Sequence, residues 1–74
     1  MAKTKNYEFQ VGQNVKFYVK RFRKWYEGKV EGQYEEEGDL KGCYHIRVTK
    51  AEGPWAQYEI GHRWLVDPQL IVAL

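Results

Sequence analysis

Three short runs of this sequence alternate between apolar and polar residues, and this period of two constrains the fold more than any other feature. The runs are "NVKFYVK" (14–20), "KWYEGKVEG" (24–32) and "GCYHIRVTK" (42–50). Alternation of this kind is typical of a strand that buries one face and exposes the other. Each run is therefore predicted to be an antiparallel strand on a common core. The residues expected to face that core are Val15, Phe17, Val19, Tyr26, Gly28, Val30, Tyr44, Ile46 and Val48.

Turn-forming segments separate these runs. "KRFRK" (20–24) joins the first two runs, "YEEEGDLKG" (34–42) contains the breakers Gly38 and Gly42, and "AEGPW" (51–55) contains the strong turn signal Gly53-Pro54. A fourth strand is expected within residues 55–66, although Gly61 interrupts its pattern. The chain is therefore predicted to be a series of short strands with tight connections.

The C-terminal part is predicted to end on a buried strand. Pro68 fixes its own φ and disfavours helix before it, so "VDPQL" (66–70) is expected to form a turn, with one 3-10 turn near Pro68. "LIVAL" (70–74) follows as the fifth strand. Because the sequence shows no long helical period, we predict an all-β fold. The predicted architecture is a small five-stranded barrel, which leaves no open sheet edge.

The totals limit the number of domains and the means of stabilisation. A chain of 74 residues makes one domain at most, expected over residues 11–74 behind a flexible N-terminal segment, 1–10. The 3 Trp, 6 Tyr and 3 Phe are enough for a compact core.

A single cysteine, Cys43, excludes an internal disulfide within these residues. No apolar run is long enough to span a bilayer, so a cytoplasmic protein is the expectation, with no membrane partner.

Charge is distributed unevenly along the chain. Residues 1–30 carry eight basic and two acidic groups, a net charge of +6, and residues 31–74 carry four basic and eight acidic groups, a net charge of −4. Such asymmetry indicates a polar interaction surface. Folding could instead interleave the two halves and cancel the field, and both interpretations stay open.

Two stretches resemble a known group of small barrels. "VGQNVKFYV" (11–19) and "KWYEGKVEG" (24–32) are similar to the opening of the Tudor, Agenet and chromo-barrel group of SH3-like barrels, where a VG-x-x-V strand precedes a W-Y-x-small-x-V strand. "YHIRV" resembles the third strand of that group, and "WLVDPQLI" resembles its closing turn and last strand. The matching residues of the first two strands are Val11, Gly12, Val15, Trp25, Tyr26, Gly28 and Val30.

The resemblance implies a five-stranded SH3-like (Tudor-like) barrel that binds rather than catalyses. Members of the group bind methylated lysine or arginine in an aromatic cage, or bind nucleic acid or protein on the barrel surface. Tyr18 and Trp25 correspond to cage positions, whereas Tyr44 is predicted to face the core. The linker before Trp25 often carries an acidic residue in the group but here is the basic "KRFRK", which favours an anionic ligand.

A cluster of basic and aromatic residues is therefore the first candidate site. Lysine and arginine neutralise phosphates, and exposed rings stack on bases. Trp25 is the most informative member, because a large exposed ring on a strand usually has a partner. The alternative is that Trp25 covers the open end of the barrel, with the lysines as a solvated rim. The predicted nucleic-acid-binding residues are Lys16, Tyr18, Lys20, Arg21, Arg23, Lys24, Trp25 and Lys29.

Protein docking is the second candidate function. "GPWAQYEIGHRW" (53–64) carries Trp55, Tyr58 and Trp64, residue types that anchor interfaces. Core filling is the favoured interpretation of Tyr58 and Trp64. A protein-interaction site would therefore use Trp25 and Trp55, and a homodimer that covers an aromatic patch is a further alternative.

Metal binding and catalysis find little support. Cys43, His45 and His62 are the three soft ligands, fewer than the four that a structural zinc site uses. The residues include no serine, no phosphate-binding glycine loop and no third group to orient a Cys43–His45 pair. No metal, cofactor or enzymatic activity is predicted.

Overall fold

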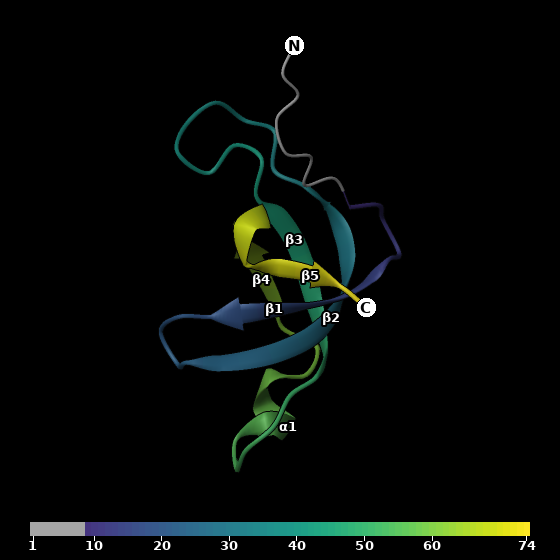
Figure 1. Cartoon of the computed structure of the whole chain (residues 1–74), viewed down its shortest axis with the longest axis vertical. Helices are drawn as coiled ribbons and strands as arrows, with labels where there is room; N and C mark the ends of the chain where they lie inside the picture. Colours follow the sequence, from purple (N-terminus) through teal and green to yellow (C-terminus); the bar gives the residue numbers. More distant parts are fainter. Residues whose placement is uncertain (1–8) are drawn as a thin grey trace.

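The computed structural model describes residues 9–74, so most of the predicted flexible segment (1–10) lies outside the described residues. Five strands, one helical turn and one 3-10 turn make up this part of the chain. In chain order they are β1 (Asn14–Val19), β2 (Lys24–Gln33), β3 (Tyr44–Lys50), α1 (Ala56–Glu59), β4 (Arg63–Val66), η1 (Pro68–Leu70) and β5 (Ile71–Ala73) (Figure 1).

All five strands belong to one antiparallel sheet in the order β4-β3-β2-β1-β5. The predicted all-β class and the five strands are confirmed. The edge strands β4 and β5 are joined through η1, and no pairing between them is present in residues 9–74. The sheet is therefore open, and its strand pairing does not establish the predicted closure into a barrel.

The core is built from the alternating positions, as predicted. All nine inward-facing residues expected from the period of two are buried, and Val66 and Ile71 join them from β4 and β5. Phe17 and Tyr26 are cross-strand partners whose rings meet edge to face at 5.8 Å. Such aromatic pairs add stability beyond the area that they bury, which matters in a domain of this size.

The C-terminal turn forms as predicted, but the last strand is buried only in part. Asp67 Oδ1 accepts a hydrogen bond of 2.9 Å from the Gln69 N–H, and Pro68 takes the first position of η1, where a missing N–H costs nothing. In β5, Ile71 is buried, whereas Val72 and Leu74 are exposed. β5 pairs with β1 at the sheet edge and has one side chain in the core, so "LIVAL" (70–74) is not the fully buried strand expected.

Gly28 lets β2 and β3 approach each other closely. A Cβ built at Gly28 would clash with the backbone oxygen of Arg47 and lie 2.6 Å from Ile46 Cγ2. The register between the strands also shifts between Glu27 and Gly28, which is the signature of a β-bulge. The shift sets Lys50 opposite Glu27, so this glycine helps determine which side chains of β3 meet the start of β2.

A matched pair of glycines in β2 tests this close approach. We expect Gly28→Ala to lower the free energy of unfolding by roughly 1–3 kcal/mol, because the added methyl group must displace backbone. Gly32→Ala is the control, because a Cβ built there meets nothing within 4 Å. Urea unfolding of the three proteins measures the difference. Equal unfolding midpoints for the two variants would contradict the steric role of Gly28.

Candidate nucleic-acid interface

Trp25 lies on the outer face of the sheet, away from the core. It is 47% exposed and pairs across the strands with Tyr18, with the ring centroids 5.3 Å apart. Lys16, on the same face, places its Nζ 5.0 Å from the centre of the Trp25 ring. The alternative in which Trp25 covers the end of the core is therefore wrong. The ring stands among cations on a surface that solvent reaches.

A groove of about 580 Å³ runs beside this ring. It lies where the first residues of β2 meet the segment that follows β3. Four of the predicted site residues come together in it, from β1, from the β1–β2 turn and from β2. The lining residues are Lys16, Arg23, Lys24, Trp25, Glu27, Lys50, Ala51, Glu52 and Gly53.

The groove is electropositive on balance. Its four cations, Lys16, Arg23, Lys24 and Lys50, outnumber two carboxylates, Glu27 and Glu52, which leaves a net charge of +2. The acidic run of residues 35–39 lies in the loop beyond the other end of β2 (Figure 1). The ten residues of β2 correspond to about 30 Å of extended chain, several times the ~8 Å Debye length at physiological salt. That loop therefore does not cancel the field of the groove.

The turn between β1 and β2 sets where its basic side chains lie. The Phe22 N–H donates to the Val19 carbonyl at 3.2 Å, and the Arg23 N–H donates to the Lys20 carbonyl at 3.3 Å. Arg23, the last residue of the turn, has φ 54°, in the left-handed region that residues other than glycine seldom adopt. The geometry places Arg23 in the groove, while Lys20 and Arg21 line a separate depression of about 180 Å³ with Tyr18.

Two predicted residues border the groove without lining it. The Tyr18 ring packs against that of Trp25 with the two planes tilted by 59°, and Lys29 lies on the same outer face, further along β2. Sequence reasoning missed Lys50, which the period of two places on the inner side of β3. The register shift at Gly28 moves it opposite Glu27, and a bulge of this kind leaves no clear signal in the sequence.

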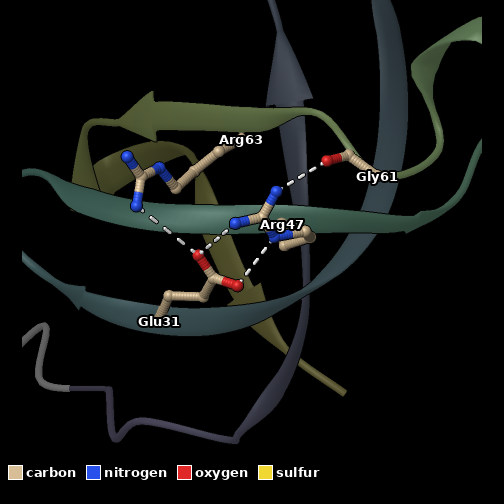
Figure 2. Close-up of polar contacts among 4 residues, drawn as sticks. All are labelled: Glu31, Arg47, Gly61 and Arg63. Atoms are coloured by element: carbon tan, nitrogen blue, oxygen red, sulfur yellow. Dashed lines mark hydrogen bonds and ion pairs between the residues drawn. The ribbon is translucent and has the colours of Figure 1, made fainter.

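A second polar cluster crosses the same face of the sheet (Figure 2). Arg47 donates to Glu31 through Nε at 2.7 Å and through Nη2 at 3.1 Å, and its Nη1 donates to the Gly61 carbonyl at 2.8 Å. Arg63 approaches the same carboxylate at 3.8 Å. Hydrogen bonding from Arg47 lowers the pKa of Glu31, and the same bonds raise the pKa of Arg47.

A smaller pocket of about 340 Å³ has a different character. The rings of Phe22, Tyr26 and Trp55 line it together with Glu52, Glu59 and Lys24. Trp55 is 67% exposed and contacts Tyr58 at a ring distance of 5.7 Å.

The aromatic residues after β3 divide between surface and core. Tyr58 is exposed, so its predicted place in the core is wrong: it belongs to the single turn of α1, which has no buried residue. Trp64 does pack against the core, with its ring 6.1 Å from those of Tyr26 and Phe22. Of the three candidate anchors in this segment, Trp55 and Tyr58 therefore remain available to a partner.

Within residues 9–74, no three histidine, cysteine or acidic side chains are grouped so that they could hold a metal ion. Cys43 is buried beside β3, and burial raises the pKa of its thiol, which keeps it protonated at neutral pH.

In the described part of the chain, no helix has the length and apolar character needed to cross a membrane.

Comparison with known proteins gives no relative for this chain. No family model matches the sequence, and no curated protein or solved structure matches it either. A function must therefore be inferred from the groove, the aromatic pocket and the charges on the sheet.

The Glu31–Arg47 pair makes a testable prediction about pH. Because the pKa of Glu31 is lowered in the folded state, the pair stabilises the fold at neutral pH and ceases to do so as the pH falls through that lowered pKa. Carboxyl NMR titration should show a Glu31 pKa below its ordinary value. Arg47→Gln should return it toward that value, and Arg63→Gln should change it less. An unchanged Glu31 pKa in Arg47→Gln would contradict the assignment.

Proposed function

We propose that this protein is a non-enzymatic binding module whose ligand is nucleic acid, held in the groove beside Trp25. One observation carries the proposal: a half-exposed tryptophan stands in a groove where four cations face two carboxylates. Phosphates require cations, and unpaired bases require an accessible ring face. The groove offers cations and the accessible ring of Trp25 on neighbouring side chains.

A base that stacks on the face of Trp25 covered by Lys16 would displace the Lys16 ammonium group. A cation–π contact at an exposed site is worth about 0.5–1 kcal/mol. A base stacked on an aromatic ring is worth about 1–3 kcal/mol, and the displaced ammonium group can then neutralise a phosphate. The exchange therefore favours the bound state. Lys16 protects the ring in the free protein and contacts the backbone of the ligand in the complex.

We further propose that the fold is an SH3-like barrel of the Tudor-like kind. The support is the succession of five short antiparallel strands, the single 3-10 turn before the last strand, and the return of β5 to pair with β1. In such a barrel the outer face of β1 and β2 is available for ligands.

Protein interaction through Trp55 is the second candidate function. The observation in its favour is the pocket beside α1, where three rings and two carboxylates outnumber the one cation, Lys24, and leave a net charge of −1. Aromatic faces and carboxylates attract organic cations, so a partner would contribute a lysine or arginine side chain. A homodimer would need such a side chain to come from a second copy of this chain.

The two exposed tryptophans separate these candidates. We expect Trp25→Ala to weaken the binding of a labelled single-stranded oligonucleotide by about fivefold or more, because stacking on the ring is lost. Trp55→Ala removes an equally large, more exposed ring, and should leave that affinity unchanged. Fluorescence anisotropy at low salt measures binding, and thermal unfolding confirms that both variants fold. The affinity of the wild-type protein should fall steeply as salt is added.

Two results would contradict the first candidate. The absence of oligonucleotide binding by the wild-type protein at low salt would exclude nucleic acid as the ligand. Loss of binding in Trp55→Ala, with normal binding in Trp25→Ala, would move the site to the pocket beside α1.

A further inference from the structure

A row of cations crosses the sheet beyond the groove. The strand register places Lys29 beside Arg47, and Arg47 beside Arg63, on neighbouring strands β2, β3 and β4. Neighbouring strands lie about 4.8 Å apart, so these three side chains form a continuous line on the face that carries Trp25. Figure 2 shows Glu31 beside Arg47 and Arg63. Together with Lys29, these groups keep a net charge of +2.

The members of this row differ in how firmly they are held. Arg47 is fixed by two hydrogen bonds to Glu31 and one to the Gly61 carbonyl. The side chain of Arg63 is 54% exposed, and its ion pair with Glu31 is long, at 3.8 Å. Lys29 is exposed and forms no ion pair within residues 9–74. Arg63 and Lys29 can therefore turn toward an anion without breaking the Glu31–Arg47 pair.

The distance between Trp25 and this row corresponds to a short piece of nucleic acid. Trp25 and Lys29 are four residues apart on one strand, a separation of about 13 Å. A stacked strand advances about 3.4 Å per nucleotide, so about four or five nucleotides span the ring and the row. This length lies at the low end of the ~4–16 nucleotides that comparable small β domains cover.

We propose that the ligand is a single strand of nucleic acid, which stacks a base on Trp25 and crosses the sheet so that Lys29 and Arg63 contact its backbone. This inference depends on the proposed nucleic-acid function and extends its site from the groove to β4. The predicted contact length is four to five nucleotides.

Double-stranded DNA fits this surface less well. The face that carries Trp25 is built from several strands of one sheet, whereas the major groove, about 12 Å wide, admits a single α-helix or a two-stranded ribbon, so the face cannot enter it. The bases of a duplex are also stacked on one another, and Trp25 reaches a base face only after unstacking. A duplex could contact the cations through its phosphates, but it would gain nothing from the ring.

The test combines ligand length with charge-removing variants. We expect affinity at low salt to rise as single-stranded oligonucleotides lengthen from two to about five nucleotides and then to level off, and to exceed the affinity for a duplex of the same sequence. Lys29→Gln and Arg63→Gln should each weaken the binding of a hexanucleotide about threefold. Each should also reduce the slope of log affinity against log salt concentration by about 0.7. Neither substitution should change the affinity for a trinucleotide. Lys41→Gln, in the β2–β3 loop, is the control of equal charge change and should have no effect.

The outcomes separate this inference from the function on which it depends. If no oligonucleotide of any length binds the wild-type protein, the proposed function itself fails. If oligonucleotides bind, the inference is overturned by a duplex that binds as tightly as the single strand. It is equally overturned if Lys29→Gln and Arg63→Gln bind the hexanucleotide as Lys41→Gln does.

Discussion

The approach of β2 to β3 at Gly28 is the constraint on which the rest of this structure depends. A side chain there would meet the backbone of Arg47, so the strands pair as they do because this position has none. The accompanying bulge changes the register, and Lys50 then faces Glu27 across the start of β2. The core residue Tyr26 and the ring of Trp25 lie just before this bulge, on opposite faces of the strand. One glycine thus connects the packing of the core with the cations of the groove.

Much of the fold could be predicted from the sequence, because the strong period of two makes the inner face of each long strand unambiguous. The burial of Phe17, Tyr26 and Ile46 followed directly from that pattern. The segment between β3 and β4 could not be predicted in the same way. Its single helical turn is too short to show a helical period, so the exposed Tyr58 was expected in the core. Closure of the sheet depends on pairing between distant strands, which local periodicity does not report.

The candidate site was predictable where it follows a strand and not where it depends on tertiary contacts. Lys16 and Trp25 were expected on one outer face, and the structure places them in contact. Lys20 and Arg21 are close to Trp25 in sequence, but the hairpin turn directs them to a different depression. Lys50 enters the groove only through the bulge. The acidic loop of residues 35–39 folds to the far end of β2, where salt screens its charge from the groove, and this arrangement could not be predicted from the charge count along the chain.

The central claim is that nucleic acid binds on the outer face of the sheet at Trp25. An amide NMR titration of the protein with a single-stranded hexanucleotide tests it most directly. The account predicts progressive shifts at the start of β2, in Lys16 and in residues 50–53, with little change in α1 or in the β2–β3 loop. Shifts centred on Trp55 and α1, or a spectrum that the oligonucleotide leaves unchanged, would contradict it.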